Sequence, residues 1–387
     1  MAKKEIVKII TALGQGCIIA AVTLFVMCPF SCKVTAEGIK LITGDYTPPV
    51  LEEFAVIDES NLKLNFSEAV NISGIVISDV SSMDYGSLSH SQTIDLSLSL
   101  RAASGEFGRL ESSWELEDEG KTVLINIIDG TEIGKCYEVY GIVKDQTGNS
   151  ITFAVPFIGF NPRIPYILMT EIQTVSISSQ NKAEKNAGTY RNEFIEFLAV
   201  TDGNLCGVEL VSGYDGEERK YVFPDLEVTA GEVFVVHLRN RGEGCINETG
   251  DDLDSAFSGY TKPGIRDLWS DDRATVLGNK NDVIILRNPA SGDIIDGVMY
   301  VNNSTEEWSK DMEPLAQQLA ASSIYPSAEI TDAVNVNDMS DTKTMHRVSA
   351  WEIMQKIEKG EEIEFPVLSG KLDWVVGAES AGVINPL

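Results

Sequence analysis

Residues 190–200 constrain the fold of this chain more than any other stretch, because they read Tyr-Arg-Asn-Glu-Phe-Ile-Glu-Phe-Leu-Ala-Val. Aromatic and aliphatic side chains on both faces predict a strand that is buried on both sides. Two acidic residues, Glu193 and Glu196, interrupt the apolar run. Strand side chains alternate between faces, so an offset of three points these carboxylates in opposite directions, and they cannot chelate one ion together unless a bulge intervenes. Glu196 shares a face with Phe194 and Leu198, and we therefore expect it to be hydrogen-bonded or paired.

The N-terminus has the pattern of an export signal. Lysines in the first eight residues precede an apolar run over residues 17–30, which is shorter than the roughly 20 residues of a membrane-spanning helix. The run closes with Cys-Pro-Phe-Ser-Cys at residues 28–32. A cysteine after a small residue at this point resembles the cleavage site of bacterial lipoproteins. Pro29 stands where leucine is usual, which is similar to the relaxed sites of spirochaete lipoproteins.

This resemblance implies a signal peptide over residues 1–31, a lipid on Cys32 and a tether over residues 32–46. Cys28 is the second choice for the lipidated residue. The protein would then be exported and held in the membrane by a lipid anchor, at the outer membrane or the cell surface. An ordinary secretory signal and an uncleaved anchor remain alternatives.

Charge and cysteine content exclude several classes of protein. The net charge of −29 repels phosphate backbones, so we expect no nucleic-acid partner. Beyond the N-terminal segment only Cys136, Cys206 and Cys245 remain, an odd number without CxxC spacing. Neither a disulfide framework nor a structural zinc site is therefore predicted. A bridge between Cys206 and Cys245 stays open.

Residues 47–160 predict a first antiparallel β-sandwich of short alternating strands. The expected strands are 51–57, 61–66, 74–77, 94–100, 122–128, 136–143 and 150–157. The region resembles a bacterial immunoglobulin-like module of surface-layer proteins in its Pro48-Pro49 start, in Leu-Asn-Phe-Ser-Glu-Ala-Val at 64–70 and in Asp-Gln-Thr-Gly-Asn at 145–149. That resemblance implies a spacer or adhesive domain without catalysis. The 145–149 stretch could be taken for a calcium loop, but a hairpin turn explains it more simply.

After a proline-rich boundary at residues 160–165, a second set of strands is predicted at 166–173, 190–200, 207–212, 220–223, 233–238, 282–287 and 294–300. The motifs in this region include Thr-Glu-Ile at 170–172, Glu-Phe-Ile-Glu-Phe at 193–197, Leu-Cys-Gly-Val-Glu-Leu at 205–210, Asn-Asp-Val-Ile-Ile-Leu at 281–286 and Asp-Gly-Val-Met-Tyr at 296–300. In this order they resemble a lamin-tail domain, itself an immunoglobulin-type sandwich, which would extend over residues 166–386. The motif positions that the resemblance marks as structural are Glu193, Glu196, Gly207, Gly231 and Asp296. Its closing motifs would be His346-Arg347, Asp373-Trp374 and the segment 382–385.

Residues from about 303 to 371 are expected to form a helical insert in this second sandwich. One helix would present Trp308, Met312, Leu315 and Leu319 on one face, with Pro314 kinking it or starting a new turn. For a second helix, Ser349 and Glu352 predict a capping box and Gly360 predicts the end. We expect these helices to cover one edge or end of the sandwich. Binding of a partner is the alternative role.

Catalytic motifs are absent from the sequence. His90, His237 and His346 have no metal-ligand spacing, and neither GxSxG, a P-loop nor GxGxxG after a strand occurs. His237 ends an apolar run and is interpreted as a packed or hydrogen-bonding residue.

The best candidate site is an acidic loop. Asp251, Asp252 and Asp254 could contribute to a weak calcium site, because calcium prefers carboxylate and carbonyl oxygens. A solvated acidic loop is the simpler interpretation, since the spacing of an EF-hand is missing. Calcium is thus the one cofactor considered.

The sequence predicts a mainly β chain with two immunoglobulin-like antiparallel β-sandwiches, the second with a helical insert. The resemblances imply a non-catalytic, lipid-anchored envelope protein that binds or tethers a protein or glycan partner. A calcium-dependent adhesin is the alternative, for which Tyr260 and Trp269 are the candidate exposed aromatics. A hydrolase that uses the acidic loop and the insert is a further alternative.

Overall fold

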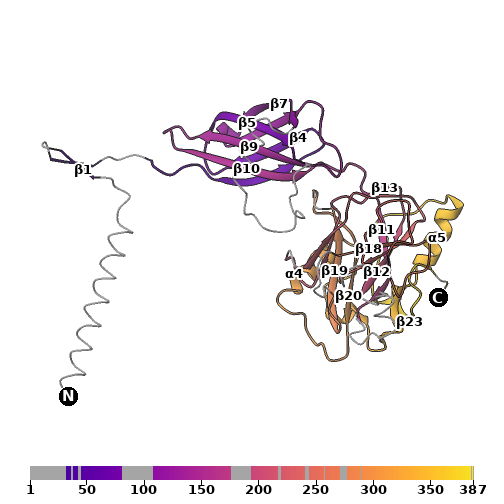
Figure 1. Cartoon of the computed structure of the whole chain (residues 1–387). Helices are drawn as coiled ribbons and strands as arrows, with labels where there is room; N and C mark the ends of the chain where they lie inside the picture. Colours follow the sequence, from indigo (N-terminus) through magenta and orange to yellow (C-terminus); the bar gives the residue numbers. More distant parts are fainter. Residues whose placement is uncertain are drawn as a thin grey trace, which may run out of the picture.

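The structure is a computed structural model of the chain. It describes residues 45–80, 108–175, 193–216, 219–239, 244–256, 258–270, 277–288, 290–384 and 386, and the backbone of two short strands near the N-terminus. The predicted strand 94–100, His90 and Cys28 lie outside the described residues. The prediction of a mainly β chain is confirmed (Figure 1).

The expected tether contains two short strands, β1 (Cys32–Thr35) and β2 (Gly38–Leu41), which pair antiparallel. Cys32 is therefore described only as the first backbone position of β1. Among the helices of the described residues, none is both long and apolar enough to cross a membrane.

The first sandwich consists of two four-stranded sheets with the strand orders β3-β4-β8-β7 and β10-β9-β5-β6. Apolar side chains from both sheets form one core, which includes Leu64, Phe66, Ile125, Val139 and Phe157. Alternation fixes the register, since the odd-numbered neighbours of Leu62 and Leu64 in β4 are only half-buried. The strands are β3 (Leu51–Val56), β4 (Asn61–Phe66), β5 (Asn71–Asp79), β6 (Gly108–Leu110), β7 (Ser112–Glu117), β8 (Thr122–Ile127), β9 (Cys136–Lys144) and β10 (Ser150–Ile158).

The second sandwich packs a six-stranded sheet, in the order β18-β17-β12-β11-β22-β23, against a five-stranded sheet, in the order β15-β14-β19-β20-β21. Its core contains Ile195 and Phe197 from the first sheet and Leu210, Ile284 and Tyr300 from the second. The strands of the six-stranded sheet are β11 (Ile167–Gln173), β12 (Phe194–Ala199), β17 (Val233–His237), β18 (Arg266–Trp269), β22 (Lys343–Arg347) and β23 (Trp374–Ala378). Those of the other sheet are β14 (Glu209–Ser212), β15 (Lys220–Val222), β19 (Asn281–Arg287), β20 (Ile294–Val301) and β21 (Val334–Asn335), and β13 (Gly203–Asn204) pairs separately with β16 (Glu227–Val228).

The central position expected for the 190–200 stretch is confirmed, because β12 pairs with β11 on one side and β17 on the other. Every residue of β12 is buried. Gly207 and Gly231 both have positive φ angles, 83° and 90°, which explains why glycine occupies these two motif positions.

Two helices cover the outer faces of the second sandwich rather than one edge or end, so the expected placement is wrong. Helix α4 (Glu313–Ala321) packs Leu315 and Leu319 onto β19 and β20 of the five-stranded sheet. Helix α5 (Ala350–Lys359) packs Ile353 onto Leu168 and Leu198 of the six-stranded sheet. The two helices and the sheets they cover can be followed in Figure 1.

The helix ends agree with the sequence in two of three features. Pro314 lies in the first turn of α4, and Gly360 ends α5 with a left-handed φ of 66°. The expected capping box is not formed, because Ser349 makes no cap hydrogen bond. Its hydroxyl instead donates to Oδ2 of Asp373, the residue just before β23, at 2.8 Å. The insert is also only partly helical, since it contributes β22 to the six-stranded sheet.

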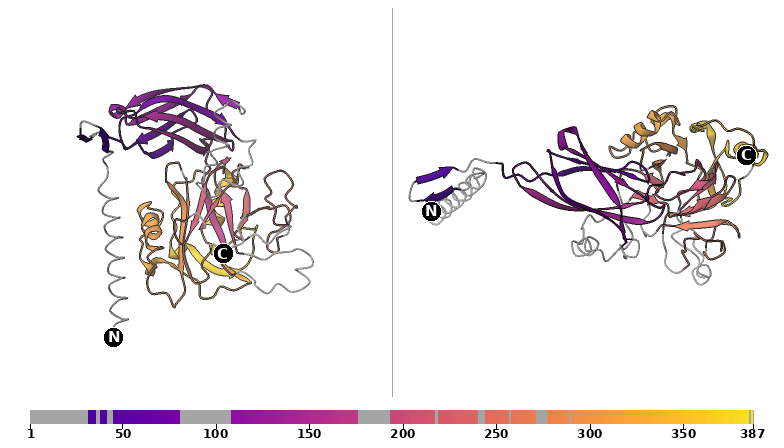
Figure 2. Two further views of the ribbon diagram at one scale, coloured as in Figure 1. Left: turned by 60° about the vertical axis from the view of Figure 1, so that its left-hand side comes forward. Right: turned by 90° about the horizontal axis from the view of Figure 1, so that it is seen from above.

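The connector between the sandwiches is bonded to the second one. The Asn161 side chain donates to the carbonyl oxygens of Asn204 and Cys206, at 2.7 and 3.0 Å. Figure 2 shows the two sandwiches from two further directions, joined through this segment.

Candidate functional site

A row of buried ionisable groups crosses the outer face of the six-stranded sheet. Glu196 of β12 lies opposite Glu171 of β11, which in turn lies opposite His346 of β22. A register shift between Met169 and Glu171 accompanies this arrangement. Glu171 and Glu196 are each only 1% exposed, so two carboxyl groups face each other inside the protein.

Glu196 is bonded on both carboxyl oxygens, as the sequence predicted. Thr170 donates its hydroxyl to Oε1 at 2.6 Å, and the backbone N–H of Gly382 donates to Oε2 at 2.6 Å. Burial, together with the neighbouring charge of Glu171, raises the pKa of Glu196 to about 8. This shift favours the protonated form of Glu196 at neutral pH.

Glu171 is the most heavily bonded carboxylate of the row. It accepts the Thr344 hydroxyl at 2.7 Å, and both the backbone N–H and the hydroxyl of Ser380 at 3.0 and 2.8 Å. His346 Nδ1 lies 3.4 Å from Glu171 Oε2. The C-terminal segment thus lies over the row and is fastened to both glutamates, at Ser380 and at Gly382.

A protonated carboxyl group opposite a carboxylate can exchange a proton with a substrate only if the substrate reaches it. Here every described partner of the two glutamates belongs to the sandwich or to its C-terminal segment. The row therefore attaches the C-terminal segment to the six-stranded sheet.

Arg347 joins the closing motifs that the sequence placed far apart. Its guanidinium donates to both oxygens of Asp296 at 2.9 Å, to Asp373 Oδ2 at 2.9 Å and to the Leu368 carbonyl oxygen at 3.1 Å. It also lies 5.8 Å from the centroid of the Trp374 ring. The motif residue Asp296 is wholly buried, and burial raises its pKa while the charge of Arg347 opposes that rise.

Glu193 points away from Glu196, as the offset of three predicted. It lies just before β12, and Arg239 Nη2 donates to its Oε1 at 3.0 Å. Glu193 and Glu196 are thus bonded to different groups, Glu193 to Arg239 and Glu196 to Thr170 and Gly382.

His237 ends β17 and is wholly buried. Its Nε2 lies 2.6 Å from Asp267 Oδ1, and its ring stacks on Trp269 with centroids 4.1 Å apart. The Thr261 hydroxyl donates to the same Asp267 oxygen at 2.6 Å. Trp269 and Tyr260 are both buried, so the expectation that they form an exposed aromatic surface is wrong.

The residues of the predicted calcium loop serve local turns. Asp252 accepts the backbone N–H of Asp254 at 3.2 Å and the Ser255 hydroxyl at 2.7 Å. Asp254 accepts the backbone N–H of Gly264 at 3.1 Å, and Asp251 is exposed. These three carboxylates do not converge.

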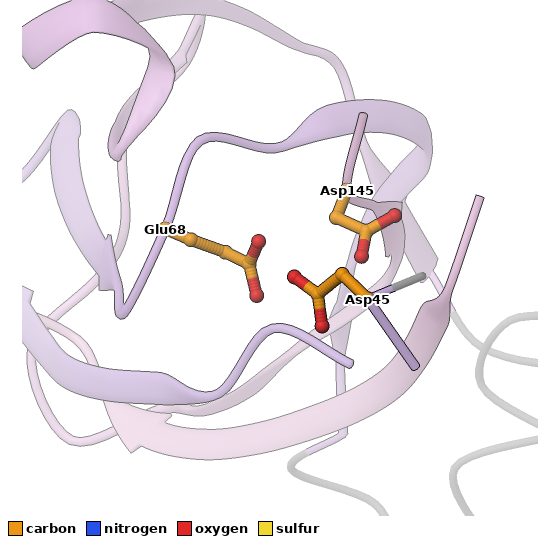
Figure 3. Close-up of side chains that lie close together, drawn as sticks. All are labelled: Asp45, Glu68 and Asp145. Atoms are coloured by element: carbon orange, nitrogen blue, oxygen red, sulfur yellow. The ribbon is translucent and has the colours of Figure 1, made fainter. Parts of the chain in front are cut away.

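Three carboxylates converge elsewhere, at one end of the first sandwich. Asp45, Glu68 and Asp145 each bring an oxygen within 4.8 Å of the others, and their side chains point toward one another (Figure 3). Burial alone would raise the pKa of Asp145, but hydrogen bonds from Asn149 and Thr147 outweigh it and lower the pKa. The 145–149 turn is the hairpin expected between β9 and β10, and sequence reasoning missed that two other segments bring carboxylates to it.

The described cysteines form no disulfide, and Cys206 is buried while Cys136 and Cys245 are half-buried. A Cys206–Cys245 bridge is therefore not made in this structure.

Comparison with known proteins gives a family for the second region. Residues 165–376 match the family model TP_1001_2nd, described as "protein second domain". A protein of Treponema pallidum (strain Nichols), named "Uncharacterized protein", is 25% identical over 184 residues, which are 47% of this chain and 44% of that protein. The chain thus matches less than half the length of this curated relative, which comes from a spirochaete.

Solved structures with similarity to the chain have low TM-scores. A DUF4876 family protein from Bacteroides thetaiotaomicron is 11% identical, with a TM-score of 0.28 over 72% of this chain and 83% of that one. The N-terminal part of the bacterial S-layer protein SbsC is 16% identical, with a TM-score of 0.23 over 49% of this chain and 40% of that one. The family model covers more than half of the sequence, and the chain therefore belongs to the TP_1001_2nd family.

Proposed function

We propose that this chain is a non-catalytic, lipid-anchored protein of the cell envelope, whose lamin-tail-like second region binds or tethers a protein or glycan partner. The observation that carries the non-catalytic part is the set of partners that the buried ionisable side chains have. Glu171, Glu196 and Arg347 are each bonded to other groups of the same sandwich and to the C-terminal segment. Groups held in this way stabilise a scaffold, and a scaffold presents its binding surface on loops and outer faces.

The lipid anchor rests on the cysteine-containing end of the N-terminal apolar run. The direct test is incorporation of labelled fatty acid by cells that express the chain. Label should be lost in Cys32→Ala, or in Cys28→Ala if the second choice is correct. Incorporation that survives both substitutions together would exclude the anchor.

The envelope location is tested separately by adding protease to intact cells. Digestion of the chain would locate it at the surface, and protection that ends on permeabilisation would move its role to the periplasm. Crosslinking on the same cells would then identify the partner class.

A calcium-dependent adhesin remains the alternative function. It predicts that Asp251, Asp252 and Asp254 contribute to a calcium site. The hydrolase alternative has less support, because His237 is wholly buried beneath Trp269 and Thr261. An activity that is lost in Asp251→Asn or His237→Gln would favour it.

A further inference from the structure

Among the described residues, strand β7 is the edge of one sheet of the first sandwich. It ends the sheet β3-β4-β8-β7, and its residues from Ser112 to Glu117 pair with β8 without a register shift. Within the described ranges, no other strand pairs with its second side. The backbone N–H and C=O groups on that side can therefore accept an added strand.

One face of this edge is apolar and only half-covered. Trp114 lies opposite Ile125, and Leu116 lies opposite Val123, both of which belong to the buried core. Trp114 and Leu116 are nevertheless 45% and 46% exposed. The core thus continues to the edge and ends there in two large apolar side chains that further apolar groups could cover.

A groove of about 490 Å³ lies beside Trp114, between residues of β5 and β6 and residues of β7. The wall of the groove at Gly74 borders open space, because a Cβ atom added to this residue would have no atom within 4 Å. Strand β6 pairs with β5 only from Ile77 to Asp79, so the preceding part of β5 has no described partner on this side. The groove is lined by Gly74, Ile75, Val76, Arg109, Leu110, Glu111, Ser112 and Trp114.

The opposite face of β7 is acidic. Glu115 and Glu117 alternate with the apolar residues, are exposed, and make no ion pair with a described lysine or arginine. Two copies of β7 paired edge to edge would bring these carboxylates together, and like charges opposite each other destabilise a sheet. The charge pattern therefore disfavours a second copy of this chain and favours a cationic strand.

Edge strands are commonly protected by charged side chains, by proline or by a bulge. Strand β7 has the charges of Glu115 and Glu117, but it contains no proline and pairs with β8 without a bulge. The other edge of the same sheet, β3, does contain a register shift, between Leu51 and Glu53, and follows Pro48-Pro49. The two edges of one sheet thus differ, and β7 is the accessible one.

We propose that the free edge of β7 binds an extended segment of a partner protein in which apolar side chains alternate with lysine or arginine. The segment adds to the sheet as a further strand. Its apolar side chains lie over Trp114 and Leu116 and enter the groove, while its cationic side chains face Glu115 and Glu117. Backbone pairing supplies the affinity, and the alternation of charge and apolar groups supplies the selectivity.

The test uses the full chain in detergent and two labelled peptides, one that alternates lysine with valine and isoleucine and one with glutamate in place of lysine. Fluorescence anisotropy should show binding of the cationic peptide only. In the variant Glu115→Lys/Glu117→Lys the preference should reverse, with at least about tenfold weaker binding of the cationic peptide, equal to 1.4 kcal/mol. The matched control Glu52→Lys/Glu59→Lys changes the net charge equally at exposed sites away from β7 and should keep the wild-type preference.

Two further measurements test strand addition itself. Methylation of alternate backbone nitrogens of the cationic peptide removes hydrogen-bond donors and should abolish binding. Hydrogen exchange of the Ser112–Glu117 amides should slow when the unmodified peptide is added. Equal binding to the charge-reversed variant and to the control would overturn the proposal. So would amides of β7 that are already protected and do not respond to the peptide, because another segment or a second copy would then occupy the edge.

Discussion

Glu171 and Glu196 lie directly opposite each other on neighbouring strands, and the C-terminal segment bonds to both of them through Ser380 and Gly382. Two carboxyl groups facing each other in a buried place cannot both be charged without a large cost in free energy. Burial and the neighbouring Glu171 raise the pKa of Glu196 to about 8, and this shift favours a proton on Glu196, so that the two groups are not both charged. The attachment of the C-terminal segment is thereby linked to pH.

Glu196→Gln should remove this link. In the unfolded chain the carboxyl group loses its proton above its ordinary pKa of about 4.5, whereas in the folded chain it keeps the proton up to about pH 8. Its contribution to stability is therefore complete below about pH 4.5 and is lost as the pH rises to about 8. The variant carries no titrating group there, so its free energy of unfolding relative to wild type should rise between pH 5 and pH 8.5, by an amount on the order of a few kcal/mol.

Urea unfolding at a series of pH values measures this difference. The exposed control Glu361→Gln should differ from wild type by a small and constant amount over the same range. A constant difference for Glu196→Gln as well would contradict the assignment of the proton to Glu196.

The sequence predicted the burial and the hydrogen bonding of Glu196, but it did not predict which residues surround it. Alternation in a strand is a local property, so the burial of Glu196, its need for a partner and its separation from Glu193 followed from positions 193 to 198 alone. Its neighbour Glu171 and the hydroxyl of Thr344 are 173 positions apart in the sequence and meet only because β22 pairs with β11. Such a pairing leaves no local pattern, and β22 was hidden inside a region expected to be helical.

The same limit applies to the carboxylates of the first sandwich. Asp145 belongs to a turn that the sequence identified, but Asp45 and Glu68 come from other segments. The predicted calcium loop had three acidic residues close in sequence, yet their carboxylates bond to separate turns. Local density of acidic residues was a poor guide, because convergence of side chains depends on the fold.

Arg347→Met should be strongly destabilising. The substitution leaves Asp296 buried without its cation and frees Asp373 and the Leu368 carbonyl oxygen. Breaking one partner of a buried ion pair typically costs about 3–5 kcal/mol. Denaturant unfolding should give a loss of this size in the free energy of unfolding.

The companion variant is Arg347→Met/Asp296→Asn, in which the wholly buried charge at position 296 is removed together with its cation, while Asp373 still lacks its arginine. Its loss in free energy of unfolding should be smaller than the losses of Arg347→Met and Asp296→Asn added together, because substitutions of contacting groups do not have additive effects. Additive losses would mean that the two side chains do not act as a pair.

Gly297 and Leu319 should behave as a compensating pair. A Cβ at position 297 of β20 would lie 2.4 Å from Leu319 Cδ1 on helix α4. Gly297→Ala alone should therefore destabilise the packing of α4 by overfilling it, and Leu319→Ala alone should cost about 2–5 kcal/mol by leaving a cavity. The double variant should lose less than the two losses added together, although the Ile284 carbonyl oxygen at 3.1 Å limits the recovery. Thermal unfolding of the four proteins completes the cycle, and strict additivity would contradict the contact.

The calcium prediction for Asp251, Asp252 and Asp254 can be separated from any effect of the carboxylates at the other sandwich. A weak site with a dissociation constant between 0.1 and 1 mM would, in 10 mM calcium, stabilise the fold by about 1.4–2.7 kcal/mol. The melting temperature of wild type should then be higher in calcium than in chelator, and Asp251→Asn/Asp252→Asn/Asp254→Asn should lose the difference.

Glu68→Gln should keep the difference between calcium and chelator. This variant should also raise the melting temperature in chelator, because it relieves repulsion among Asp45, Glu68 and Asp145. The opposite result, in which calcium stabilisation survives the triple substitution and disappears in Glu68→Gln, would move the ion to the first sandwich and end the role of the acidic loop. An equal melting temperature of wild type in calcium and in chelator would remove calcium from the protein's function altogether.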